Sequence, residues 1–153
     1  IQDFVLRGDG SGREFLHMKA GGSKLPASAE TVAKREHFVF QDGKRVFKFA
    51  VEGMVSTVKE VVRRNHLTMD EIDRLVPHQA NMRITKSIVK ALDFPDTVKV
   101  ATDIETAGNT SAASIPLALD RMRQEGVAKS GDLALLVGFG AGLAYAGQVI
   151  RIP

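Results

Sequence analysis

The chain has 153 residues, of which 44% are hydrophobic and 25% are charged, and this composition is typical of one globular domain. With 21 basic and 18 acidic residues its formal charge is +3, which permits an acidic partner and gives little support for a nucleic-acid partner. The absence of cysteine excludes a disulfide framework, a cysteine-ligated metal site and a cysteine nucleophile within this chain.

Further functional classes are disfavoured by what the sequence lacks. No apolar run approaches the roughly 20 residues that a membrane-spanning helix needs, and the first residues do not resemble a signal peptide. The four histidines lack the spacing of metal ligands. We therefore expect a soluble, cytoplasmic protein with no metal site and no membrane or nucleic-acid partner. Because the chain has no initiator methionine, we also expect it to be a piece of a longer protein.

The first forty residues show glycine-rich turns and little periodicity, which predicts a strand, a turn, a second strand and a loop. From Val46 to about Asn65, apolar residues recur at three- and four-residue steps, which predicts an amphipathic helix. Thr68 and Glu71 have the spacing of a capping box, so a short helix is expected to begin there. A short apolar strand follows from Ile72 to Val76 and ends at Pro77, because proline cannot supply a ladder N–H.

The rest of the chain alternates helices and strands. We expect a helix from about Ala80 to Leu92, a strand from Val98 to Ala101, and a third helix with Pro116 near its first turn. An apolar strand from Asp132 to Val137 and a last strand from Leu143 to Ile152 flank a glycine-rich loop. This order predicts an α/β fold with a mostly parallel five-stranded mixed sheet, helices on both of its faces, and an antiparallel last pair of strands.

Three loops that follow strands contain most of the candidate functional residues. In a parallel sheet such loops lie together at the carboxyl edge, where open α/β sheets bind ligands. The loops are Pro77-His78-Gln79-Ala80-Asn81, Gly108-Asn109-Thr110-Ser111 and Gly138-Phe139-Gly140-Ala141-Gly142. His78 and Asn109 can donate hydrogen bonds to one carbonyl oxygen and stabilise negative charge on it, and the glycine-rich loop can add a backbone N–H.

Each of these loops also has a structural interpretation. A single histidine after a strand is more often a packed or solvated residue than a catalyst, and Asn109 also fits a cap of the third helix. Asn109 to Ser111 matches a glycosylation sequon, but nothing indicates secretion. The glycine-rich loop fails as a dinucleotide-binding motif, because Leu143 stands where the third glycine is needed.

A basic stripe lies on the helix that begins beside His78. Arg83, Lys86 and Lys90 are spaced by three and four residues, and Lys48 is a candidate neighbour. A solvated helix face explains this pattern, and so does a docking site for an acidic protein or a phosphorylated ligand. Stacking aromatic residues are not interleaved with the stripe, which disfavours a nucleic-acid site.

Taken together, three segments resemble the second half of the β-ketoacyl-acyl-carrier-protein synthase III family: residues 76–84 (VPHQANMRI), 108–116 (GNTSAASIP) and 138–142 (GFGAG). Residues 45–51 (RVFKFAV) resemble the opening of a helix in the same family. The resemblance implies the thiolase fold, with two similar α/β halves. It implies that residues 1–42 are the end of the first half and a connecting loop, and that residues 43–153 are the carboxyl-terminal thiolase-like domain.

The family starts bacterial type II fatty acid synthesis by decarboxylative condensation of an acyl-CoA, typically acetyl-CoA, with malonyl-acyl-carrier protein. In the family a cysteine of the first half takes the acyl group, and a histidine and an asparagine stabilise the enolate, which the resemblance assigns to His78 and Asn109. It places Phe139 against the histidine and assigns an oxyanion-hole N–H to Gly140 or Ala141.

The resemblance also implies where substrates and partners bind. The positions that line the pantetheine tunnel are Gly43, Phe47, Ala80 and Asn81. The surface that docks the acidic carrier protein is formed by Lys48, Arg83 and Lys90, with Lys86 on the same stripe. The family uses acyl-CoA and malonyl-acyl-carrier protein as substrates, needs no cofactor, and forms homodimers when full length.

Three interpretations remain open at this point. Because the chain has no cysteine, the resemblance implies half of an active site, inactive alone, whose nucleophile lies in an amino-terminal half outside the chain. A related thiolase-fold condensing enzyme with another primer or product, and a non-catalytic module that binds carrier protein or CoA, are the alternatives. Locally, Asp42-Gly43 is typical of a hairpin turn, whereas the family begins a helix at Gly43, and we adopt the family's version.

Overall fold

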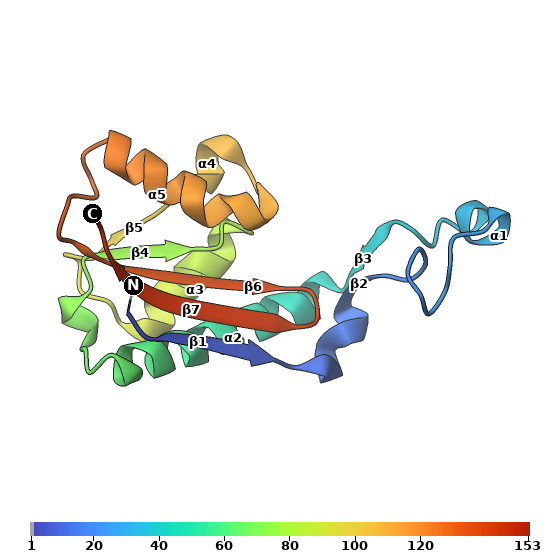
Figure 1. Ribbon diagram of the computed structural model, residues 1–153, viewed down its shortest axis with the longest axis horizontal. Helices are drawn as coiled ribbons and strands as arrows, with labels where there is room; N and C mark the ends of the chain where they lie inside the picture. Colours follow the sequence, from blue (N-terminus) through green and yellow to red (C-terminus); the bar gives the residue numbers. More distant parts are fainter. Residues whose placement is uncertain (1) are drawn as a thin grey trace.

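In the computed structural model, which describes residues 2–153, five strands form one mixed sheet in the order β1-β7-β6-β4-β5 (Figure 1). These strands are β1 (Phe4–Gly8), β4 (Arg74–Pro77), β5 (Lys99–Val100), β6 (Leu133–Gly140) and β7 (Ala144–Arg151). β7 is antiparallel to β1 and to β6, whereas β4 is parallel to both β5 and β6. Only β7 therefore runs against the others, which confirms the predicted mostly parallel mixed sheet.

Helices cover both faces of this sheet (Figure 1). α2 (Gly43–Arg64) and α3 (Met82–Leu92) bury their apolar stripes on one face, and α5 (Ser114–Gln124) packs on the other. Because successive strand residues point to opposite faces, the neighbours Leu75 and Val76 belong to two different apolar clusters. The predicted arrangement of helices on both faces is therefore confirmed.

α2 approaches β7 closely at two glycines. A Cβ atom added to Gly53 would lie 2.0 Å from Cε1 of Tyr145, and one added to Gly147 would lie 2.8 Å from Cγ2 of Thr57. The Tyr145 ring fills the space beside Gly53, and its hydroxyl donates to the carbonyl of Phe49 at 3.2 Å. These contacts fix the height of α2 above the sheet, and the first turn of α2 reaches the site described below.

The ends of several elements differ from the sequence prediction. α2 begins at Gly43, because the Asp42 carboxylate accepts from the Arg45 N–H at 3.1 Å, so the helix opening taken from the family is confirmed and the local turn is wrong. α3 begins at Met82 rather than near Ala80, since the Asn81 side chain caps it by accepting from the Arg83 N–H at 2.8 Å.

Further corrections concern the strands and short helices. β6 continues through Gly140, because Gly138 to Gly140 pair with β7, so this part of the expected glycine-rich loop is strand. β4 begins at Arg74 and includes Pro77, its last residue. The expected short helix is the 3₁₀ turn η2 (Met69–Glu71), whose Glu71 carboxylate accepts from the Thr68 N–H at 2.8 Å. Two short elements, α4 (Ile104–Ala107) and η3 (Ser111–Ala113), precede α5 and were not predicted.

The first forty residues contribute a strand to the sheet and an arm that projects from it (Figure 1). After β1 and the 3₁₀ turn η1 (Gly10–Phe15), β2 (Leu16–Met18) pairs antiparallel with β3 (Val39–Gln41), and α1 (Ala29–Ala33) lies between them. Neither η1 nor α1 was predicted. β1 lies in the same sheet as the strands after residue 43, and the division of the chain at residue 42 stays a prediction.

Candidate active site

A cavity of about 1190 Å³ opens where β4 and β6 end and where α2 and α3 begin. Its wall also includes residues of β1, β2, β3 and β7. The predicted catalytic, oxyanion and pantetheine residues all line this one cavity: Gly43, Phe47, His78, Ala80, Asn81, Asn109, Phe139, Gly140 and Ala141. The predicted docking residues lie outside it.

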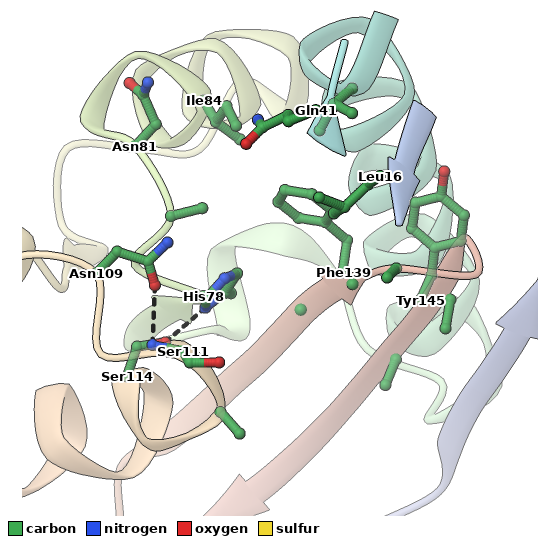
Figure 2. A pocket seen from close by; sticks show the side chains of 18 of the residues that line it. Leu16, Gln41, His78, Asn81, Ile84, Asn109, Ser111, Ser114, Phe139 and Tyr145 are labelled. Carbon is green, nitrogen blue, oxygen red and sulfur yellow. Dashed lines mark hydrogen bonds between the residues drawn. The ribbon is translucent and has the colours of Figure 1, made fainter. Parts of the chain in front are cut away.

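His78 follows β4 directly and is held by contacts on several sides (Figure 2). Its backbone N–H donates to the Val137 carbonyl at 2.7 Å, so the strand pairing extends to this residue. Its ring packs edge-on against Phe139, with 5.7 Å between the ring centroids. Its Nδ1 atom lies 2.6 Å from Oγ of Ser114, and the same Oγ accepts from the Gln79 N–H at 3.2 Å. The ring orientation is therefore fixed within the cavity wall.

Burial lowers the pKa of His78 below its ordinary value of 6.5, because desolvation disfavours the imidazolium form. At neutral pH the ring is therefore uncharged and has one N–H donor and one acceptor nitrogen. The folded state binds this proton less tightly than the unfolded state does. The stability linked to His78 is thus fully present above pH 6.5 and is lost as the pH falls from 6.5 through the folded-state pKa.

Asn109 lies between α4 and η3, and its side-chain amide is oriented by a single hydrogen bond. Its Oδ1 atom accepts from the Ser111 N–H at 2.9 Å. The amide nitrogen therefore faces the cavity and has no hydrogen-bond partner among residues 2–153 (Figure 2). Ser111 is the first residue of η3, which continues directly into α5 at Ser114, so Asn109 accepts from the first N–H of the third helical segment, as its interpretation as a cap predicted. His78 is thus hydrogen-bonded to the side chain of Ser114, and Asn109 to the backbone of Ser111, three residues earlier.

The end of β6 supplies the remaining predicted residues. Phe139 extends its ring into the cavity (Figure 2), and Gly140 is the last residue of the strand. Ala141 lies in the turn to β7, and its N–H has no hydrogen-bond partner among residues 2–153. A free N–H at the cavity wall is the group that an oxyanion hole needs. Between the two candidate positions, this geometry favours Ala141.

The residues assigned to pantetheine binding lie at the starts of two helices. Gly43 and Phe47 belong to the first turns of α2, whereas Ala80 and Asn81 precede α3. A Cβ atom on Gly43 would meet no atom within 4 Å, so the cavity is open at this point. The Oδ1 atom of Asn81 is used in the cap of α3, whereas its amide nitrogen has no hydrogen-bond partner among residues 2–153.

The basic stripe lies next to this part of the cavity. Arg83 contacts its rim, with its guanidinium carbon 5.7 Å from the centroid of the Phe47 ring. Lys48 lies 4.0 Å from a carboxylate oxygen of Glu52, and Lys86 and Lys90 are exposed on α3. The four cations therefore lie on the surface of the two helices whose first turns line the cavity.

Two residues of the site were missed from the sequence. Ser114 contacts His78, although its place in a run of small residues indicated only close helix packing. Gln79 is 1% exposed; its amide nitrogen donates to the carbonyls of Pro77 (2.7 Å) and Ala101 (3.3 Å), and its oxygen accepts from the Ile104 N–H (3.1 Å). Gln79 thereby ties the loop after β4 to the loop after β5. Its position beside His78 was the only sequence signal.

Residues 2–153 contain no cluster of three or more His, Asp or Glu side chains placed to bind a metal ion. Among the helices of this part of the chain, none has the length and apolar character required to cross a membrane.

The sheet order, the helices on both faces and the cavity at the strand ends define a thiolase-like α/β domain. The model of the family described as 3-oxoacyl-[acyl-carrier-protein (ACP)] synthase III C terminal matches residues 62–152. The chain belongs to this family, which confirms the resemblance drawn from the three sequence segments.

Individual relatives agree with this assignment. The β-ketoacyl-[acyl-carrier-protein] synthase III of Caldanaerobacter subterraneus is 49% identical over 95% of this chain and 44% of its own length. Among solved structures, 3-oxoacyl-(acyl carrier protein) synthase III of Pseudomonas aeruginosa is similar with a TM-score of 0.85 at 36% identity, covering 99% of this chain and 45% of that one. A priming β-ketosynthase from a polyketide biosynthetic pathway has a TM-score of 0.87 at 39% identity, covering 99% and 45%. The chain thus spans about half the length of the relatives it matches.

Proposed function

We propose that this chain is the carboxyl-terminal half of a synthase that condenses an acyl-CoA, typically acetyl-CoA, with malonyl-acyl-carrier protein to give 3-oxoacyl-acyl-carrier protein. The observation that carries the proposal is the pair of His78 and Asn109 in one cavity wall, each with a side-chain nitrogen free to donate. The full-length protein would act as a homodimer in the bacterial cytoplasm, without a cofactor.

The chemistry requires stabilisation of negative charge at the malonyl thioester. When the bond to the carboxylate breaks, carbon dioxide leaves and the electron pair is delocalised onto the thioester oxygen. His78 and Asn109 would donate to that oxygen, and their N–H groups are oriented before the charge develops. The enolate carbon then attacks the carbonyl of an acylated cysteine, and the cysteine thiolate leaves. That cysteine must come from outside this chain, which has none.

The surroundings of the pair also fit a thioester substrate. The free N–H of Ala141 would stabilise the oxyanion formed on the acyl group during the attack. Gly43, Phe47 and Ala80 line the cavity near the starts of α2 and α3, and this part of the cavity would admit the pantetheine arm. Phe139 packs on His78 and would help to exclude water from the reacting atoms once the substrate is bound, and donors act more strongly in a dry site.

The proposed function is tested by product formation. A full-length protein that carries this chain should form 3-oxoacyl-acyl-carrier protein from acetyl-CoA and malonyl-acyl-carrier protein, as measured by intact mass spectrometry of the carrier. This chain alone should form none, because it has no nucleophilic cysteine. Absence of product from the full-length protein with every acyl-CoA of a panel would contradict the proposal. Preference for an unusual primer would instead select the related condensing enzyme, which the likeness to a priming β-ketosynthase supports.

Carrier-protein docking is predicted to depend on Arg83. Changing Arg83→Glu places a negative charge at the rim of the cavity and should weaken binding of holo-acyl-carrier protein to the full-length protein about tenfold at low salt. Fluorescence anisotropy with a labelled carrier at two ionic strengths measures this. Arg123→Glu, on α5 at the opposite face of the sheet, is the matched control and should leave binding unchanged. Equal loss in both variants would argue against a docking site on this stripe.

The non-catalytic alternative makes a different prediction for this chain by itself. A carrier-protein or CoA-binding module would bind holo-carrier protein in the absence of the other half, and this binding would weaken with salt. Absence of binding by the isolated chain at low salt, together with product formation by the full-length protein, dismisses the module.

A further inference from the structure

Ser114 occupies a position where its hydroxyl group has few hydrogen-bond partners. It is the first residue of α5 and is 0% exposed. Two polar atoms of residues 2–153 lie at hydrogen-bond distance from its Oγ atom. They are the backbone nitrogen of Gln79 at 3.2 Å and Nδ1 of His78 at 2.6 Å. The direction of each of these bonds follows from the protons that are present.

A serine hydroxyl has one proton to donate and lone pairs that accept. The Gln79 N–H can only donate, so Oγ of Ser114 accepts from it. The hydroxyl proton then has one acceptor within reach in the described chain, which is Nδ1 of His78. If Nδ1 carried a proton of its own, the buried hydroxyl would keep an unpaired donor, and buried polar groups are rarely left in that state.

We infer that Ser114 is a positioning residue that holds His78 in the tautomer with its proton on Nε2. The second ring nitrogen then presents an N–H to the cavity, whose wall also contains Asn109 (Figure 2). The opposite tautomer would present a lone pair to the thioester oxygen and repel the developing charge. This inference rests on the proposed function for its catalytic consequence, but the tautomer itself is a property of the folded protein.

The lowered pKa of His78 is consistent with this arrangement. Because burial keeps the ring neutral, only one of its two nitrogens carries a proton, and the other can accept from the Ser114 hydroxyl. The ring nitrogens thus have different and fixed roles, one as acceptor from the serine and the other as donor to the substrate.

The test combines nuclear magnetic resonance with kinetics on the full-length protein. With ¹⁵N-labelled histidine, the proton of neutral His78 should be found on Nε2 in the wild type. In Ser114→Ala the neutral ring should instead be a mixture of the Nε2–H and Nδ1–H tautomers. The same substitution should lower kcat for malonyl decarboxylation roughly 10- to 100-fold with little change in KM, as expected when the partner that orients a reacting imidazole is lost. Ser114→Thr, which keeps the hydroxyl, should retain the Nε2 proton and most of the activity.

Ser130→Ala, an exposed serine outside the cavity, is the matched control and should change neither readout. A wild-type ring with its proton on Nδ1 overturns the inference, and so does a folded Ser114→Ala variant with an unchanged tautomer. If Ser114→Ala does not fold, the wild-type and Ser114→Thr tautomers decide. A wild type that holds the Nε2 proton without decarboxylating any malonyl thioester supports the role of Ser114 in fixing the ring and instead contradicts the proposed function.

Discussion

Replacing His78 by alanine is expected to lower the rate of malonyl-acyl-carrier protein decarboxylation by the full-length protein about 10²- to 10³-fold, the usual effect of removing one oxyanion donor. In the proposed mechanism the imidazole would donate more strongly to the thioester oxygen as charge develops there, so kcat should fall more than KM rises. The rate is measured as carbon dioxide release from the malonyl thioester.

Two companion variants sharpen this experiment. Asn109→Ala removes the other donor and should cost a similar factor, whereas the double variant should cost less than the product of the two, because the donors serve one oxygen. His66→Ala removes an exposed histidine just beyond α2 and outside the cavity, so it should leave decarboxylation unchanged. Unchanged decarboxylation in His78→Ala would refute the role assigned to this residue.

Replacing Gly53 by alanine is expected to destabilise the fold by about 1–3 kcal/mol, because overpacking forces the helix or the ring to move. The new Cβ atom would lie 2.0 Å from the Tyr145 ring, which is held by its hydrogen bond to Phe49. At an open helix position the same change stabilises by up to about 1 kcal/mol, so the sign of the effect is diagnostic. Urea unfolding followed by circular dichroism measures the change in free energy of unfolding.

Gly43→Ala provides the matched control for this prediction. Gly43 is the other glycine of α2, and a Cβ atom there would meet nothing within 4 Å, so this variant should not lose stability. In a Tyr145→Ala background, the cost of Gly53→Ala should largely disappear, because the clashing ring is gone. A stabilising effect of Gly53→Ala in the wild-type background would show that α2 is less closely packed on β7 than described.

The elements with strong local signals were predicted well. The apolar period after Val46 predicted the central helix, because an amphipathic helix buries one face. The continuous apolar run before Val137 predicted a buried strand, because a strand covered on both sides buries both of its faces. Element ends were missed where a single hydrogen bond decides them, as with the Asn81 cap of α3. The strand character of Gly138 to Gly140 was missed because pairing with β7, rather than local propensity, determines it.

In the site, too, residues marked by their local sequence were predicted, whereas a contact between residues distant in sequence was not. The loop sequences after the strands placed His78 and Asn109 at one edge, and the cavity contains both. Their individual roles came from the family resemblance and stay predictions. Ser114 could not be recognised, because its contact with His78 joins residues 36 apart in sequence and depends on how α5 packs on the sheet.

The place of β7 between β1 and β6 has a consequence for the order in which the protein assembles. Gly8 pairs with Ala144, so β1 can pair only after β7, which is synthesised after nearly all of the described chain. Until β7 arrives, β1 and β6 each lack the neighbour that separates them in the sheet, and unpaired strand edges favour aggregation. β1 and β7 also contribute Leu6, Arg7 and Tyr145 to the cavity wall. The sheet and the cavity wall therefore cannot be complete before β7 has been synthesised, and a chain that ends before Ala144 lacks both the partner of β1 and part of the cavity wall.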